Sequence, residues 1–304
     1  MKVIPSLLFD FHNDCIDLDG NILFRKIFSM EEYEEYKSSV FGPRQDLENE
    51  LAYKVCSQSE KIYHLPGYSD TGGALTEFLL DLNYSDGHTP NFRERLVCPL
   101  TRLNNRQRFI CNFLRRTVDL HNYTSIFSFE QATPVYRFIS QHLTNTNILG
   151  SEYLGIYANR GGVVNGIRHE DATDLTFNDE SFDIVFSSEV LNRTPDLLKT
   201  LCETSRVIKE GGMFIFSTPF AMNSKETTQR ARMNGGEVHH LFDARYFVGA
   251  HTKDQQSPVF YDLGWDIFDS MKKAGFKNAY LLCYYSYFYG YLGEALQSIF
   301  IAEK

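Results

Sequence analysis

The chain has 304 residues, of which 43% are hydrophobic, and its formal net charge is −9. This hydrophobic content can supply a full core, so the composition excludes a wholly disordered chain. The negative charge and the absence of a long Lys/Arg run disfavour nucleic acid as a partner, because binding to phosphates relies on positive charge. No apolar stretch approaches the ~20 residues of a membrane-spanning helix, so we expect no membrane span.

The six cysteines stand far apart and form no C-x-x-C pair. The N-terminal stretch MKVIPSLLFDFHND has only a short apolar run, soon followed by acids, and it lacks a small-residue cleavage site. Without a secretory signal, the cysteines are predicted to be reduced and mostly buried thiols. We therefore expect a cytoplasmic protein.

The first sixty residues are acidic and irregular. The stretch DLDGN (residues 17–21) indicates an Asp-Gly turn, because no further oxygen ligands follow at the spacing of a calcium loop. A helix is predicted in SMEEYEEYKSSV (29–40), and Gly42-Pro43 is expected to end it.

From about residue 105 segments typical of strands and helices alternate. A helix with one apolar face is predicted at 106–118, and further helices at 133–143, 194–212 and 264–276. Thr133 is placed to cap the second of these, and Pro134 suits its first turn. Strands are predicted at 125–129, 147–153, 163–170, 181–188, 213–220, 279–286 and 296–304.

This alternation predicts parallel strands with helical crossovers, while the last two strands can form a hairpin. The expected fold class is α/β: a Rossmann-like doubly wound, mainly parallel seven-stranded sheet with a C-terminal antiparallel hairpin, plus a small irregular N-terminal region. The polar segment 221–262 interrupts the alternation after the fifth strand, and such an insertion is expected to arch over a site as a substrate cap.

Three acids follow the first three strands of this pattern: Glu130, Glu152 and Asp171. Ligands of such sheets bind beyond the carboxyl ends of the strands. A carboxylate about 20 residues after the first strand–helix turn is the familiar partner of ribose hydroxyls, and Asp171 would suit an exocyclic amine such as that of adenine. Any single strand-end acid is more often just solvated, but three in register favour a nucleoside site.

The stretch HEDATDLTFNDESFDIVFSSEVLNRTPDLLKTLCETSRVIKEGGMFIFSTPF (169–220) resembles the central part of class I S-adenosylmethionine (SAM)-dependent methyltransferases. The likeness rests on the acid after the third strand, on SFD opening the fourth, and on RVIKEGG before the fifth. More narrowly, NFRERLVCP, LNNRQR, EQATPVYRF, GSEYLG, VNGIRHED and LGWD together resemble a subfamily with a zinc-ribbon-like element ahead of the catalytic domain.

In that subfamily a Glu-Gln-x-Thr-Pro type of turn replaces the usual glycine loop. The resemblance covers roughly 65–304. It implies an N-terminal extension at 1–64, a degenerate zinc-ribbon-like element at 65–103, and a methyltransferase domain at 104–304.

The resemblance implies SAM as the cofactor, with Glu152 on the ribose, Asp171 on the adenine amine and Glu130 facing the amino group. A Thr-capped helix N-terminus could face SAM's carboxylate, helped by Arg106 or Arg108. The cofactor-binding residues expected on this basis are Glu130, Gln131, Thr133, Glu152, Asp171, Ala172 and Arg106.

The sequence departs from the subfamily pattern in two places. The positions of the paired metal-binding cysteines hold Ser69, Gly72, Cys98 and Thr101, and one thiolate cannot build a four-ligand zinc site. We therefore expect no metal, and an element held by packing or by contacts from the N-terminal extension. The usual Leu-Glu-His after the fourth strand is replaced by Leu-Asn-Arg at 191–193.

Methyl transfer mainly needs the donor and the acceptor to be aligned, and a hydroxyl acceptor also benefits from a general base. His240 in the insertion is the preferred candidate for this base because the subfamily places a Glu-His or similar pair there; Glu189 after the fourth strand is the second candidate and His239 the third. The predicted function is O-methylation of a small or glycan-type acceptor. The alternative is an inactive methyltransferase-like module that binds SAM or a partner protein. The sequence leaves the oligomeric state open.

Overall fold

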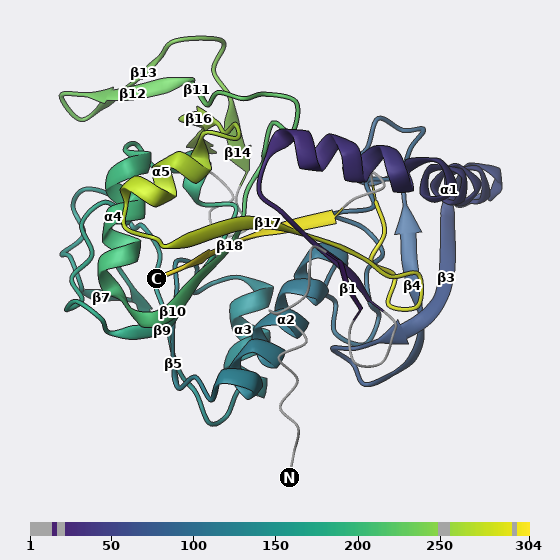
Figure 1. Cartoon of the computed structure of the whole chain (residues 1–304), viewed down its shortest axis with the longest axis horizontal. Coiled ribbons are helices and arrows are strands. Elements are labelled where there is room, and N and C mark those ends of the chain that lie inside the picture. The colour runs from purple at the N-terminus through teal and green to yellow at the C-terminus, as the bar shows by residue number, and fades with distance from the viewer. Residues whose placement is uncertain (1–13, 17–21, 249–255, 294–296) are drawn as a thin grey trace. The chain divides into compact units, whose positions relative to one another are not determined.

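The structure is a computed structural model, and it describes residues 14–16, 22–248, 256–293 and 297–304 (Figure 1). The chain divides into two compact units. Unit 1 takes the chain up to His121 together with Leu281–Ser298, and unit 2 comprises Asn122–Tyr280 and Ile299–Lys304. In this division the helix at 105–121 groups with the N-terminal part of the chain. Residues 1–13 and the DLDGN stretch (17–21) lie outside the described residues.

One eight-stranded sheet runs in the order β1-β2-β17-β18-β10-β9-β5-β6. Its central pairs β10–β9, β9–β5 and β5–β6 are parallel, and β18 joins β10 in antiparallel register. The α/β class, the parallel centre and the antiparallel C-terminal strands are therefore confirmed, although the sheet has one strand more than the expected seven. The strands are β1 (Asp14–Ile16), β2 (Leu23–Ile27), β5 (Ser125–Ser128), β6 (Asn147–Gly150), β9 (Phe182–Ser188), β10 (Ile208–Ser217), β17 (Asn278–Tyr285) and β18 (Gln297–Glu303).

The strand predicted at 163–170 does not join this sheet. It folds into a small antiparallel hairpin, β7 (Val163–Val164) and β8 (Ile167–Arg168). Asn165 and Gly166 connect the two strands with positive φ values of 52° and 80°. An Asn-Gly pair is a strong signal for a tight hairpin turn, and here it outweighs the alternation on which the longer strand was predicted.

Helix α1 (Met30–Ser57) corrects the prediction of a stop at Gly42-Pro43, because Pro43 lies inside it. Ser29 caps the helix by accepting a hydrogen bond from the Glu32 N–H at 3.2 Å. A proline inside a helix costs about 3 kcal/mol. The turns beyond Pro43 bury Leu51 and Val55 in the core of unit 1, and this burial offsets that cost.

In unit 1 the hairpin β3 (Ile62–Ser69) and β4 (Ala74–Asp81) packs against α1. The shared apolar cluster joins Leu51 and Val55 of α1 with Leu65, Phe78, Leu80, Phe92, Leu96, Cys98 and Leu292. The Cys98 thiol donates a hydrogen bond to Ser69 Oγ at 3.1 Å. Two of the four positions that correspond to metal-binding cysteines in the subfamily thus contact each other directly. The hairpin thus has the packing contacts that were expected from the N-terminal extension.

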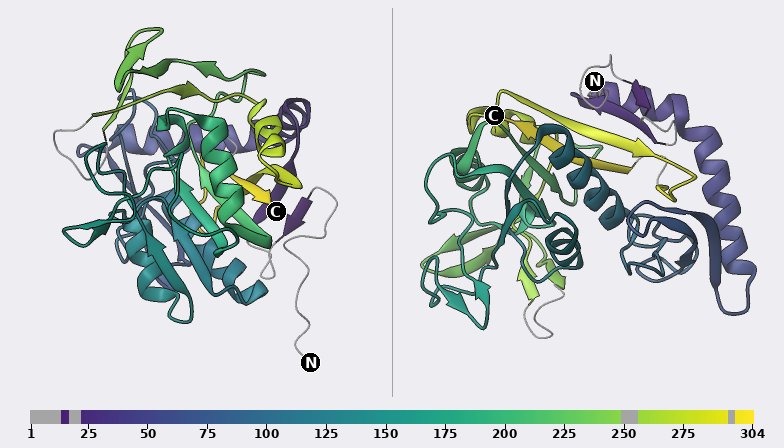
Figure 2. Two further views of the ribbon diagram at one scale, coloured as in Figure 1. Left: turned by 90° about the vertical axis from the view of Figure 1, so that its left-hand side faces the viewer. Right: turned by 90° about the horizontal axis from the view of Figure 1, so that it is seen from below.

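The remaining helix of unit 1 is α2 (Asn105–His121). Unit 2 contains α3 (Pro134–His142), the 3-10 helix η2 (Leu191–Arg193), α4 (Leu197–Val207) and α5 (Ile267–Lys273). Helices α4 and α5 lie side by side, as Figure 2 shows. In the part of the chain that the structure describes, no helix is both long and apolar enough to cross a membrane.

The insertion at 221–262 forms three two-stranded ribbons. Its hairpin β12–β13 projects from the top edge of unit 2 in Figure 1. The insertion is tied to the carboxyl end of β9, because the Phe260 N–H donates to the Asn192 carbonyl at 2.8 Å. The ribbons pair β11 (Thr228–Gln229) with β16 (Tyr261–Asp262), β12 (Ala231–Asn234) with β13 (Glu237–His240), and β14 (Tyr246–Val248) with β15 (Gln256–Pro258).

Candidate cofactor and active site

The turn after β5 is fixed by short local hydrogen bonds. Glu130 is buried, and its Oε1 accepts a bond from the Ser188 N–H of β9 at 2.7 Å. Thr133 accepts from the Tyr136 N–H at 3.2 Å and caps α3, whose first residue is Pro134. The predicted cap is therefore confirmed, and the turn holds its shape without glycines.

Glu152 lies directly after β6 and faces this turn. Its Oε1 accepts the N–H groups of Gln131 and Ala132, both at 2.9 Å. The Gln131 side chain in turn donates to the Gly166 carbonyl at 2.8 Å and accepts from the Arg168 N–H at 3.0 Å. The acid after the second strand, the turn after the first and the β7–β8 hairpin thus form one connected group.

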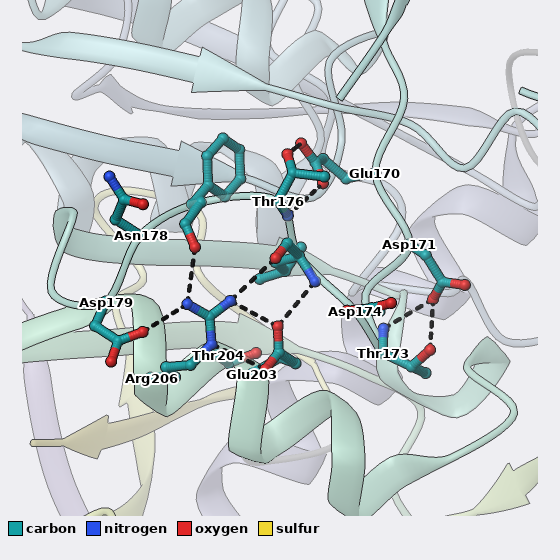
Figure 3. A network of polar contacts seen from close by, with 12 residues as sticks. Glu170, Asp171, Thr173, Asp174, Thr176, Asn178, Asp179, Glu203, Thr204 and Arg206 are labelled. Atoms are coloured by element: carbon teal, nitrogen blue, oxygen red, sulfur yellow. Dashed lines mark hydrogen bonds and ion pairs between the residues drawn. The ribbon is translucent and has the colours of Figure 1, made fainter. Parts of the chain in front are cut away.

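Asp171 follows β8 in a tight turn, and its Oδ1 accepts both the N–H and the hydroxyl of Thr173, at 2.8 and 2.7 Å. Ala172, between them, is half-buried. In Figure 3 these contacts lie beside a larger network around Arg206. Arg206 donates to the carbonyls of Leu175 and Phe177, at 3.0 and 2.8 Å.

Glu152 and Asp171 share one property. Each binds its neighbours through one carboxylate oxygen, and the other oxygen, Glu152 Oε2 or Asp171 Oδ2, carries no hydrogen bond within the described structure. A carboxylate held in this way has its orientation fixed and can still accept a bond from a ligand. The two acids can therefore receive hydroxyl or amine donors.

Glu189 occupies the carboxyl end of β9 in the left-handed region, with φ at 63°. It is buried, its N–H donates to the Ser217 carbonyl at 2.8 Å, and its Oε1 accepts from the Ser217 hydroxyl at 3.1 Å. A non-glycine residue in this conformation is strained, and such strain collects at functional sites. The buried carboxylate is held at the strand end where ligands of such sheets bind.

Arg193 in η2 joins this group. Its Nε donates to the Glu189 carbonyl at 2.6 Å. Burial lowers the pKa of Arg193, while the nearby charges of Glu130, Glu189 and Glu152 act in the opposite direction. One guanidinium therefore lies within electrostatic range of three carboxylates at adjacent strand ends.

Two more polar side chains at these strand ends are buried: Asn192 is 2% exposed and Thr218 is 5% exposed. Neither Asn192 Oδ1 nor Thr218 Oγ1 has a hydrogen-bond partner within the described structure. A buried polar atom without a partner costs free energy. A ligand group with hydrogen-bond donors would remove this cost.

The remaining predicted residues lie elsewhere. His239 and His240 are on β13 of the insertion, where His239 is exposed and His240 Nε2 lies 3.2 Å from the Tyr246 hydroxyl. Arg106 belongs to unit 1, where its Nε donates to Glu94 Oε1 at 3.0 Å. Arg108 is fully buried in unit 1 and donates to the carbonyls of Leu96, Tyr289 and Gly290.

The structure thus brings Glu130, Gln131, Glu152 and Glu189 together within unit 2, and Asp171 lies in the turn after β8. Sequence reasoning overlooked Arg193 as a member of this group and treated it only as a departure from a motif. Its position directly after a buried parallel strand was the available signal.

Comparison with known proteins finds similarity over part of this region. Residues 146–216 match the family model described as a methyltransferase domain. Over 89 residues, 27% of this chain, the sequence is 34% identical to a sterol 24-C-methyltransferase of Gibberella zeae, of which it covers 23%. Over 71 residues, 23% of this chain, it is 37% identical to a malonyl-(acyl-carrier protein) O-methyltransferase of Coxiella burnetii, of which it covers 25%.

Among solved structures, a SAM-dependent methyltransferase from Mesorhizobium loti aligns with 52% of this chain and 76% of its own, at 18% identity and a TM-score of 0.32. The chain spans about a quarter of the length of the curated relatives that it matches.

The matched segment contains β6, β9, α4 and most of β10, and it carries Glu152, Asp171, Glu189 and Arg193. This segment is therefore similar to a methyltransferase domain. The two named relatives act on different acceptors, a sterol and a malonyl-(acyl-carrier protein).

Proposed function

We propose that the chain is a SAM-dependent methyltransferase that methylates an oxygen of a small or glycan-type acceptor. The proposal that the chain binds SAM rests on the carboxylates of Glu152 and Asp171. Each has one oxygen fixed and the other able to accept a bond. Ribose hydroxyls and an adenine amine are donors of the kind that these two oxygens can receive.

The residues present fit SAM. In the proposed complex Glu152 holds the ribose, Asp171 the adenine amine, and Glu130 faces the amino group, with Gln131, Thr133 and Ala172 shaping the turns around them. SAM supplies an activated methyl group, so the protein mainly aligns donor and acceptor.

Glu189 is our first candidate for the base that takes the acceptor's proton, because it is buried, fixed by Ser217 and placed at the strand end. His240 and His239 remain candidates from the insertion, which is attached beside this strand end through Asn192. The buried Asn192 Oδ1 and Thr218 Oγ1 are suited to a methyl acceptor that donates hydrogen bonds, as a hydroxyl compound does.

Five described cysteines are free thiols, which supports a cytoplasmic location as part of this proposal.

A second candidate is a methyltransferase-like module that binds SAM or a partner without turnover. It is favoured by Arg193, which brings a positive charge into the group where the subfamily pattern has histidine. The first candidate requires the cofactor site and methyl transfer, whereas the second requires neither methyl transfer nor, where it binds only a partner, the cofactor.

Calorimetric titration of SAM and S-adenosylhomocysteine into the full chain tests the cofactor site. We expect micromolar binding, weakened at least about 100-fold in Glu152→Ala, because the change removes charged hydrogen bonds to the ribose and the anchor of the turn. Glu50→Ala, at an exposed acid of α1, is the matched control and should bind like the wild type. Absence of binding in the wild type would overturn the enzyme and leave only a module that binds a partner protein. Binding without methyl transfer to any hydroxyl compound or glycan would favour a module that binds SAM without turnover.

A further inference from the structure

SAM carries a carboxylate on its amino-acid part, and a protein that binds SAM has to neutralise this charge. Glycine-rich turns do so with backbone N–H groups at a helix N-terminus. Here the N–H groups of Gln131 and Ala132 already donate to Glu152 at 2.9 Å. The turn therefore does not present these two donors to a ligand carboxylate.

The two arginines that the sequence offered for this task are used elsewhere. Arg106 pairs with Glu94, at 3.0 Å from Nε and 3.3 Å from its second terminal nitrogen. Arg108 is fully buried and donates to three backbone carbonyls in unit 1. Removing either from these partners would leave buried polar groups unsatisfied.

Arg193 is the cation that the fold attaches to the site itself. Its Nε is bound to the Glu189 carbonyl at 2.6 Å. Glu130 is held by the residue before Glu189, because the Ser188 N–H donates to Glu130 Oε1 at 2.7 Å. Arg193 and Glu130 are thus anchored on adjacent residues at the carboxyl end of β9.

We propose that Arg193 binds the carboxylate of SAM's amino-acid part and takes over the role of the missing glycine loop. This inference rests on the proposed function. The charges are complementary: Glu130 is assigned to SAM's amino group, and the guanidinium meets SAM's one negative group. A planar guanidinium can bind a carboxylate through two parallel hydrogen bonds, so Arg193 also fixes the orientation of the amino-acid part.

The test compares SAM with decarboxylated SAM, which lacks only this carboxylate, by calorimetry on the full chain. We expect the wild type to bind SAM more tightly by at least about tenfold. Arg193→Met should weaken SAM binding about 10- to 100-fold, the range of a charge-assisted hydrogen bond or a pair of them, and change the affinity for decarboxylated SAM by less than about threefold. Arg193→Lys, which keeps the charge, should recover part of the loss.

Arg137→Met is the control, because Arg137 is an exposed arginine on α3 of the same unit. It should change neither affinity. Equal weakening of both ligands in Arg193→Met would mean a purely structural role and would overturn the inference. So would unchanged SAM binding, which would assign Arg193 to the acceptor. If the wild type binds neither compound, the proposed function fails and this inference fails with it.

Discussion

The two ends of the parallel strands in unit 2 hold their acids in different ways. At the amino ends, Asp183 of β9 uses both oxygens: Oδ1 accepts from the Lys209 ammonium at 2.8 Å, and Oδ2 accepts from the N–H groups of Thr124 and Ser125, each at 2.9 Å, and from the Ser125 hydroxyl at 2.7 Å. At the carboxyl end of β6, Glu152 uses one oxygen, and Asp171, in the turn after β8, also uses one.

The difference separates an acid with both oxygens bonded inside the protein from acids with one oxygen left to accept a further bond. Burial alone would raise the pKa of Asp183, but the hydrogen bonds from Lys209, Ser125 and Thr124 outweigh it and lower this pKa to about 2. Both of its oxygens are used inside the protein. Residue type does not distinguish the two cases, whereas the number of partners does.

The largest expected effect on stability comes from the fully bonded acid. Asp183→Asn should lower the free energy of unfolding at pH 7 by about 1–2 kcal/mol, after allowing for partial exposure to solvent. Because the folded pKa lies below the unfolded value of 3.8, this contribution is present above pH 3.8 and is lost as the pH falls toward 2. Urea unfolding of variant and wild type across this range measures the difference.

Asp179→Asn provides the control, because Asp179 pairs with Arg206 while its side chain is 75% exposed. We expect a loss of less than about 0.5 kcal/mol there. SAM affinity should stay within about twofold of the wild type in both variants. A clear loss of SAM binding in Asp183→Asn would break the comparison between the two strand ends.

Asp171→Asn should have the opposite effects to Asp183→Asn: a lower affinity for the cofactor and an almost unchanged stability. The Asn oxygen can still accept from the Thr173 N–H, so stability should change little, whereas the affinity for S-adenosylhomocysteine should fall about tenfold with the loss of a charged acceptor. The wild type should also discriminate against the inosine analogue, which has a carbonyl in place of the amine, and the variant should not. If the variant still prefers S-adenosylhomocysteine to the inosine analogue as strongly as the wild type does, Asp171 does not bind the adenine amine.

The smallest expected effect concerns the strained backbone of Glu189. Glycine tolerates its φ of 63°, whereas alanine does not, so Glu189→Gly should be more stable than Glu189→Ala by about 1 kcal/mol. Thermal unfolding of the two variants gives the comparison. If Glu189→Ala proves as stable as Glu189→Gly, the backbone at residue 189 is not strained.

Much of the parallel core could be predicted from local sequence. The apolar run SFDIVFSS predicts β9, and Thr133-Pro134 predicts the start of α3. Glu130 and Glu152 were expected after strands, and they follow β5 and β6. Two predictions failed because a competing interaction was overlooked. The burial of Leu51 and Val55 carries α1 through Pro43, and the Asn165-Gly166 turn removes a strand from the sheet.

The details of the site could not be predicted in this way. The bonds from the 131 and 132 N–H groups to Glu152, the left-handed backbone of Glu189 and the place of Arg193 among three carboxylates all depend on tertiary contacts between distant segments. Arg106 illustrates the same limit, since only the fold reveals its pairing with Glu94.

The contact between α1 and the β3–β4 hairpin has a thermodynamic consequence. Leu51 and Val55 act on the hairpin as an intramolecular ligand, joined to it by residues 58–61. A short connection of this kind holds its two ends at an effective concentration in the millimolar range. Dilution therefore cannot separate α1 from the hairpin. After a single proteolytic cut between residues 58 and 61, the packing of α1 against the hairpin would depend on protein concentration.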